Sequence, residues 1–492
     1  MSAYTDLVAR LMARPGPAAP AERRRARTGT WPRMEPWRAT SRQVCGLWPL
    51  VVSSATPMVG APLGAVINGG TGTVCADHIA WFEQGLISAP SAMVLGLNGL
   101  GKTTLVQRLI TAQAYRGVHS MVLGDIKPDY VDLVDALGGQ VITIGHGRAG
   151  INPLDAGNVA EAAVLLSDHP QERRALLAAA HERKKTMVLS LVQIIRRQPP
   201  TNREENILGE AIRLLDERGG QPVLADLLDV IRQAPPTLRA AALDRGDARR
   251  YAAVTEELEI SLMALMSGRL GAIFAERTTT PMMMDRCVVF DVSALKEEEA
   301  DVQAAVLLSC WSYGFATVEI AQTLADAGVA PRRGYGLVMD ELWRILRVSA
   351  GMVERVDALT RLNRSIGVGQ VMITHSMADL EALPSEEDRL KAAGFIERSK
   401  MLFLGGLPSR EVEMLRGVME FSKAEESLLS SWKAPGTWDP VLGQVTPPPG
   451  RGKFMLKTAD APGIPFQVSL SPAERDLSYS NQRWSMRQEA GA

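Results

Sequence analysis

The residues with the clearest chemistry form a glycine-rich segment that ends in a lysine and two threonines. The segment runs Gly96, Leu97, Asn98, Gly99, Leu100, Gly101, Lys102, Thr103 and Thr104. It follows an apolar run at residues 92–95 and precedes apolar residues at helical spacing. We therefore expect it to be a P-loop, a phosphate-binding loop that joins a strand to a helix. Backbone N–H groups and the helix dipole would then bind phosphate. Lys102 would reach the β and γ phosphates of ATP, and Thr103 would bind Mg²⁺. A glycine-rich turn that merely caps a helix is the alternative.

A nucleotide hydrolase also needs an acid that holds the metal and a carboxylate that polarises the attacking water. Asp340 and Glu341 follow one apolar run in succession, whereas Asp291 follows another alone. Because two acids can divide the two tasks, we predict that Asp340 binds the metal through water and that Glu341 is the general base. Asp291 would instead cap the next turn. Asp125, which ends the strand after the P-loop helix, would support the site or pair with Lys127.

Two further segments fit the phosphate-facing edge of the same sheet. Arg361 and Arg364 lie three positions apart on an expected helix, and either could be an arginine finger that neutralises charge on the transferring phosphoryl group. Solvated surface arginines are the alternative. Thr374 and His375 end another apolar run, and either could bind the γ-phosphate. A structural role is the alternative for an isolated histidine.

Short apolar runs separated by helical patterns indicate an α/β, doubly wound fold with a parallel sheet. They occupy residues 92–95, 121–123, 141–144, 288–290, 337–339, 371–373 and 401–404. The periodicity between residues 158 and 266 is that of helices throughout, and Thr201 with Glu204 predicts a capping box there. Two late apolar runs, 453–456 and 466–470, predict a terminal hairpin.

These patterns divide the chain into five segments. They are a disordered basic tail at 1–40, the first part of the core with the P-loop at 41–157, an all-helical insertion at 158–280, the second part of the core with the Asp-Glu pair at 281–415, and a small C-terminal extension at 416–492. A short helix for a partner or a lipid surface is the alternative for the tail.

The amino-acid composition bears on the partners and the cellular location of the protein. Among its 492 residues, 54 Lys and Arg nearly balance 55 Asp and Glu, so no chain-wide field attracts nucleic acid or membrane. The four cysteines lie far apart, which favours reduced thiols and a cytoplasmic location. No uninterrupted apolar run reaches about 18 residues, so we expect no integral membrane segment.

With these residues identified, the chain resembles the HerA/FtsK superfamily of translocating ATPases. It is most similar to the ATPases of conjugative and type IV secretion systems, of the TraC and VirB kind. The stretches that carry the resemblance are 60–64, 124–130 with 138–139 and 151–155, 340–343, and 361–376. One position departs from the group, because His375 stands where a glutamine is usual.

The resemblance implies a RecA-like core that works as a hexameric ring and shares each ATP site between neighbours. It also implies partners among the components of a type IV secretion or conjugation channel, and a cytoplasmic location that can be peripheral at the inner face of the membrane. The predicted function is Mg²⁺-dependent ATP hydrolysis that powers transport of macromolecules.

Three other functions are alternatives to this prediction. A DNA translocase or coupling protein shares the core, and Arg183 to Lys185 with Arg196 and Arg197 are its weak basic candidates, with solvated helix faces as the alternative. A nucleotide-gated scaffold that scarcely hydrolyses ATP conflicts with the presence of Glu341. An ABC-type ATPase is excluded, because no signature segment precedes Asp340 and the interval from the P-loop is too long.

Overall fold

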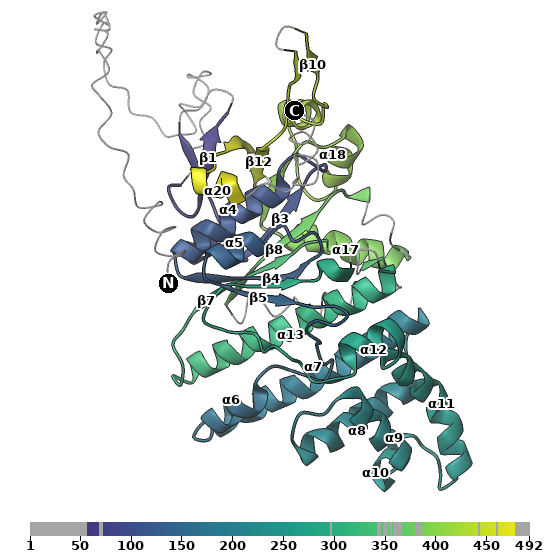
Figure 1. Cartoon of the computed structure of the whole chain (residues 1–492). Helices are drawn as coiled ribbons and strands as arrows, with labels where there is room; N and C mark the ends of the chain where they lie inside the picture. Colours follow the sequence, from purple (N-terminus) through teal and green to yellow (C-terminus); the bar gives the residue numbers. More distant parts are fainter. Residues whose placement is uncertain are drawn as a thin grey trace, which may run out of the picture.

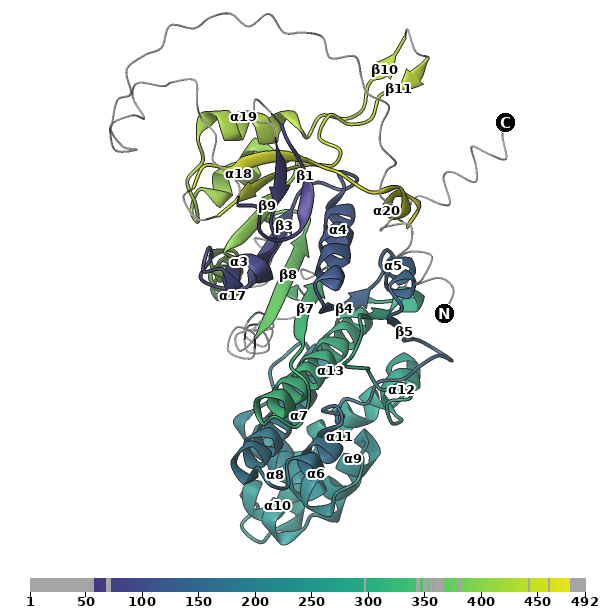
Figure 2. The same cartoon turned by 90° about the vertical axis from the view of Figure 1, so that its left-hand side faces the viewer.

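An extended sheet is the central feature of the structure. This computed structural model describes residues 57–67, 72–295, 298–341, 346–347, 353, 357, 367–378, 383, 385–440, 443–458 and 461–477. Within those residues the sheet has 11 strands in the order β2-β1-β13-β12-β9-β3-β8-β7-β4-β6-β5. Helices cover both of its faces (Figures 1 and 2). The predicted basic tail and the candidate finger residues Arg361 and Arg364 lie outside the described residues.

All seven apolar runs predicted to be strands are strands. They are β3 (Ser91–Leu95), β4 (Val118–Asp125), β5 (Gln140–Thr143), β6 (Val288–Asp291), β7 (Gly334–Met339), β8 (Val368–Thr374) and β9 (Met401–Leu404). Neighbours in the order β9-β3-β8-β7-β4-β6-β5 pair in parallel. The predicted α/β fold with a parallel sheet is therefore confirmed for this part of the chain.

Both faces of the sheet are buried, which explains why its strands are continuous apolar runs. Met93 and Leu95 of β3 belong to a core shared with α13 (Ala300–Asp326) and α17 (Glu386–Arg398). Ala92 and Val94, which alternate with them, belong to a second core on the opposite face. That core also contains side chains of α3 (His78–Glu83), α4 (Lys102–Tyr115) and α5 (Val131–Ala136). The sheet is thus held between two helical layers (Figure 1).

The segment predicted as an all-helical insertion contains helices and no strand between residues 158 and 280, all of which are described. The helices are α6 (Val159–Leu165), α7 (Pro170–Arg196), α8 (Asn202–Arg218), α9 (Leu224–Gln233), α10 (Pro236–Ala241), α11 (Ala248–Leu265) and α12 (Gly268–Phe274). The capping box of Thr201 and Glu204 is present at the start of α8. The domain boundaries themselves stay a prediction.

The long helix α13 connects the sheet to the insertion. By length and composition it could cross a membrane, but 94% of its most apolar window is buried inside the protein. One side packs on β4 and the other on α7. The approach to β4 is close at Gly314, where a Cβ atom would collide with the Leu123 side chain. α13 is therefore packed as a core helix (Figure 2).

The predicted terminal hairpin is present, but it belongs to the central sheet. β12 (Lys453–Lys457) pairs antiparallel with β13 (Ile464–Val468) and, on its other side, with β9. β13 in turn pairs with β1 (Pro62–Val66), which pairs with β2 (Thr73–Cys75). These strands cover an edge of the parallel sheet that would otherwise expose unpaired backbone groups.

The remaining elements of the described chain are short. They are η1 (Ser293–Leu295), α18 (Ser409–Leu415), α19 (Lys423–Ser431), β10 (Trp438–Asp439), β11 (Gln444–Val445) and α20 (Pro472–Leu477). β10 and β11 form a separate antiparallel hairpin that projects from the body of the protein (Figures 1 and 2).

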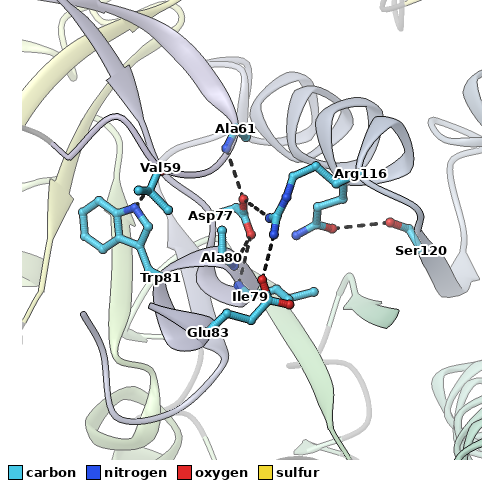
Figure 3. A network of polar contacts seen from close by, with 10 residues as sticks. Val59, Ala61, Asp77, Ile79, Ala80, Trp81, Glu83, Arg116 and Ser120 are labelled. Atoms are coloured by element: carbon cyan, nitrogen blue, oxygen red, sulfur yellow. Dashed lines mark hydrogen bonds and ion pairs between the residues drawn. The ribbon is translucent and has the colours of Figure 1, made fainter. Parts of the chain in front are cut away.

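A buried carboxylate ties the end of the P-loop helix to α3 and to the segment before β1 (Figure 3). Asp77 caps α3 by accepting hydrogen bonds from the N–H groups of Ile79 and Ala80, at 3.1 and 2.8 Å. It also accepts one from Ala61 N at 3.1 Å and one from the Arg116 guanidinium at 3.0 Å. Because Arg116 directly follows α4, this carboxylate anchors the C-terminal end of α4 to α3 and to the segment before β1.

We predict that Asp77→Ala lowers the free energy of unfolding by about 2–4 kcal/mol, because it removes a helix cap and leaves buried N–H groups without an acceptor. Glu83→Ala is the matched control, since Glu83 pairs with the same Arg116 but its side chain is 54% exposed. That variant should lose less than about 1 kcal/mol. Urea denaturation followed by circular dichroism measures both, and equal losses would contradict the central role of Asp77.

Candidate nucleotide-binding site

The glycine-rich segment forms the loop between β3 and α4, as predicted. Gly99 and Gly101 adopt left-handed backbone conformations, with φ of 78° and 99°. Residues with a side chain rarely adopt them. Gly101 is the N-cap of α4 and offers no side-chain cap, so the loop leads directly into the positive end of the helix dipole. The backbone thus has the form that binds phosphate at a helix N-terminus.

The ammonium group of Lys102 lies against the loop. Lys102 is 7% exposed, and its Nζ donates to the carbonyl oxygens of Gly96 at 2.6 Å and Leu97 at 3.3 Å. The Asn98 side-chain oxygen accepts a further bond at 3.4 Å. The first residues of the predicted P-loop therefore orient its lysine.

A cavity of about 490 Å³ joins the P-loop to the carboxyl ends of neighbouring strands. Its lining consists of Asn98, Gly99, Gly101, Lys102, Thr103, Thr104, Asp125, Ile126, Lys127, Asp129, Asp340, Glu341, Ile373, His375, Pro448 and Arg451. The predicted metal ligand Asp340 and the predicted base Glu341 thus share one cavity with Thr103. The competing acid Asp291 is not part of this lining, and its carboxylate accepts a hydrogen bond from Ser293 N at 3.0 Å. It caps the following turn, which was the alternative considered for it.

Asp340 has the environment of a cation ligand. Burial raises the pKa of its carboxyl, and the adjacent Glu341 raises it further, while the hydrogen bonds from Glu341 N and the Tyr130 hydroxyl act in the opposite direction. These two bonds measure 2.8 and 3.2 Å. Burial and the neighbouring carboxylate disfavour the ionised form of Asp340, and a nearby cation would stabilise that form. Asp340 therefore suits the binding of Mg²⁺.

The described residues contain no cluster of three or more His, Cys, Asp or Glu that could hold a metal. Mg²⁺ at nucleotide sites needs no such cluster, because one or two side chains, water and phosphate oxygens complete its coordination. Thr103 and Asp340 in one cavity meet that requirement.

Glu341 is held by two basic side chains that sequence reasoning did not assign to it. Its carboxylate accepts a hydrogen bond from Lys127 at 2.9 Å and lies 3.6 Å from the Nε2 atom of His375. Burial alone would raise the pKa of Glu341, but these two neighbours together bring it below its ordinary value. The residue also has a φ of 54°, a strained conformation that is often found at functional sites.

Asp125 lines the cavity without pairing with Lys127, so the supporting role considered for it agrees with its position. Its two carboxylate oxygens accept hydrogen bonds from Asp129 N at 3.0 Å and Tyr130 N at 2.7 Å. Burial nevertheless raises the pKa of Asp125 to about 7, against the lowering effect of these bonds. The cavity therefore contains a carboxyl that titrates near neutral pH.

The candidate sensor residues lie at the end of β8, in part inside the cavity. His375 lines the cavity, whereas Thr374 is buried beside it. The Thr374 hydroxyl and the His375 Nδ1 atom have no hydrogen-bond partner within the described structure. Two polar atoms next to the phosphate-binding loop thus retain unused hydrogen-bonding capacity.

Comparison with solved structures identifies other proteins with a similar fold. VirB4 of Thermoanaerobacter pseudethanolicus superposes with a TM-score of 0.62 at 17% identity, over 86% of this chain and 99% of that one. The chain has the fold of VirB4. The predicted resemblance to VirB-type proteins is thereby confirmed at the level of the fold. No protein-family model and no curated protein sequence matches the chain.

A second structure, the plasmid coupling protein TrwB in complex with ADP and Mg²⁺, aligns less closely. It is 14% identical over 79% of this chain and 88% of that one, with a TM-score of 0.47. A similarity of this size supports no conclusion about the site.

The raised pKa of Asp125 predicts a pH-dependent stability. The pKa of Asp125 is about 7 in the folded protein and about 3.8 in an unfolded chain. The stability that its carboxyl contributes to the folded state is therefore greatest at low pH and is lost as pH rises through 7. We expect the free energy of unfolding of Asp125→Asn, relative to that of the unsubstituted protein, to be about 2–3 kcal/mol higher at pH 8 than at pH 5. Thermal unfolding of both proteins at each pH, in EDTA and without nucleotide, measures this difference. A difference that stays constant or shrinks would contradict the buried position of this carboxyl.

Proposed function

We propose that this protein is a Mg²⁺-dependent ATPase that powers macromolecular transport by a conjugative or type IV secretion system. The observation that carries the proposal is that Lys102 and Thr103 of the P-loop share one cavity with Asp340 and Glu341. A phosphate cradle, a metal ligand and a potential base at one sheet edge are the parts that nucleotide hydrolysis requires.

Each residue has a task in the proposed reaction. The loop N–H groups and Lys102 bind the phosphates, and Thr103 with Asp340 would hold the metal. Mg²⁺, when bound, neutralises charge that develops on the phosphate oxygens. Tyr130 positions Asp340 through its hydrogen bond. Thr374 or His375 would donate to the γ-phosphate.

Glu341 would accept the proton of the attacking water. In the structure His375 and Lys127 both lower the pKa of its carboxylate, and a carboxylate whose pKa is lowered is a weaker base. The side chain of Lys127 is 45% exposed, so it can turn towards an anionic phosphate without opening the core. We therefore infer that nucleotide binding draws Lys127 away and so increases the basicity of Glu341.

Two variants test these assignments. Lys102→Ala should lower turnover by at least about 10²-fold, because it removes the cation that binds the transferring phosphate. Glu341→Gln should lower turnover by about 10²–10⁴-fold while ATP still binds, because an amide cannot accept the proton. Phosphate release and equilibrium ATP binding measure the two effects. Asp291→Asn, at the strand end outside the cavity, is the matched control and should retain activity. Normal turnover by Glu341→Gln would overturn the assignment of the base.

The fold shared with VirB4 supports a role in transport but does not define the cargo. We propose that copies of the chain assemble into a hexameric ring with ATP sites shared between neighbours, which act at the cytoplasmic side of a secretion channel. Arg361 and Arg364 remain the candidates for the arginine finger, because both lie in the segment similar to that of the HerA/FtsK superfamily. DNA is the partner that the alternative function, a DNA translocase or coupling protein, would bind.

The basic residues considered for direct DNA contact are engaged with acids. Within the described chain each of them has an ion-pair partner, namely Arg183 with Glu319, Lys184 with Asp216, Lys185 with Glu205, Arg196 with Glu204 and Arg197 with Asp301. Paired cations contribute less to phosphate binding than unpaired ones. This arrangement favours the secretion ATPase over a translocase that contacts DNA through this insertion.

ATPase rate as a function of protein concentration separates the proposed motor from its alternatives. A shared site predicts that specific activity rises steeply with concentration as rings assemble. Single-stranded DNA, added at each concentration, should leave the rate within about twofold. A large stimulation by DNA would favour the translocase, and a negligible rate under all conditions would favour the nucleotide-gated scaffold.

A further inference from the structure

A turn from the C-terminal part of the chain lies directly against the P-loop. Gly452 N donates to the carbonyl oxygen of Leu100 at 2.8 Å. A Cβ atom added to Gly101 would lie 3.5 Å from the same nitrogen. Pro448 and Arg451 of this turn line the nucleotide cavity, although they come from the extension rather than from the parallel core.

Hydrogen bonds fix the backbone of this turn, which runs from Pro448 to Gly452. Arg451 N donates to the carbonyl oxygen of Pro448 at 2.9 Å, and the Arg451 carbonyl oxygen accepts from the Gln467 side chain at 3.2 Å. Gly452 O accepts from Val468 N of β13 at 2.8 Å. The position of the Arg451 Cα atom is therefore fixed by the P-loop on one side and by the β12–β13 hairpin on the other.

The guanidinium of Arg451 differs from the other cations of the cavity. Lys102 bonds to the P-loop backbone, and Lys127 pairs with Glu341. The Arg451 side chain is exposed and has no hydrogen-bond or ion-pair partner among the described residues. Since four carboxylates line the same cavity, each available cation would stabilise a polyanion bound there.

Sheet topology decides which part of a nucleotide Arg451 would meet. The strands that carry His375, Asp340 and Asp125 (β8, β7 and β4) all lie on one side of β3, whereas β9 and β12 lie on the other. The base and the metal ligand must surround the γ-phosphate, so the phosphate chain has its γ end towards β8. Arg451, which stands two residues before β12, therefore faces the opposite end of that chain.

We propose that Arg451 binds the nucleotide at its α-phosphate, so that the C-terminal extension supplies part of the ATP site within the same chain. This inference rests on the proposed nucleotide-binding function. A planar guanidinium suits the task, because it can donate two hydrogen bonds to one phosphate group. The contact is shared by ATP and ADP and takes no part in the proton transfer.

The test compares equilibrium binding of ATP and ADP to the full chain, in the presence of Mg²⁺, by isothermal titration calorimetry. Arg451→Gln should weaken the binding of both nucleotides by about tenfold, the effect of losing a charge-assisted contact at an exposed site. Arg451→Lys should recover only part of the affinity, because an ammonium group lacks the bidentate geometry.

Lys453→Gln is the matched control. It removes the same charge two positions later, in β12, from a side chain that does not line the cavity, and it should bind both nucleotides normally. Equal weakening by Lys453→Gln would attribute the effect to general charge and overturn the inference. A loss confined to ATP would place the contact at the γ-phosphate and would also overturn it. Failure of the unsubstituted protein to bind any nucleotide would overturn both this inference and the proposed function, whereas an Arg451→Gln protein with unchanged affinity would overturn this inference alone.

Discussion

The parallel pairing of β3 with β8 on one side and β9 on the other is the constraint on which the site depends. Leu95, the last residue of β3, is level with Thr374 of β8 and Leu404 of β9. The loop that follows β3 therefore emerges between two fixed neighbours, with the carboxyl end of β8 beside it. Because both faces of the sheet are buried, a shift of β3 by one residue would exchange the two cores, so this alignment is strongly determined.

The electrostatics of the cavity follow from that arrangement. Strand ends bring Asp125, Asp340 and Glu341 together in a partly dehydrated space, where carboxylates repel one another and burial penalises their charges. His375 and Lys127 outweigh this effect at Glu341, whose pKa falls, while the pKa values of Asp125 and Asp340 rise. The site is thus poised to accept additional positive charge, which a metal bound to a nucleotide would bring.

Local patterns predicted the parallel strands and the P-loop because each is encoded within a few consecutive residues. Buried strands are continuous apolar runs, and the glycine-lysine-threonine spacing specifies its own backbone shape. The choice of Asp340 over Asp291 rested on chemistry, and their geometry agrees with it, because β7 lies nearer to β3 than β6 does. Three features were not predicted: the pairing of Lys127 with Glu341, the presence of Arg451 in the lining of the cavity, and the position of β12 beside β9. Each joins residues far apart in sequence, and no local pattern specifies such partners.

The placement of β1 between β2 and β13 has a consequence for synthesis of the protein. β1 is among the first described elements to leave the ribosome, yet one of its two partners, β13, is among the last. Until β13 emerges, β1 has only the short strand β2 beside it, and until β12 emerges the edge of β9 stays uncovered. Contacts between distant parts of a chain form slowly, and bare strand edges tend to aggregate. From the synthesis of β1 until that of β13, the nascent chain therefore exposes an unpaired strand edge, and chaperones would contribute most during this period.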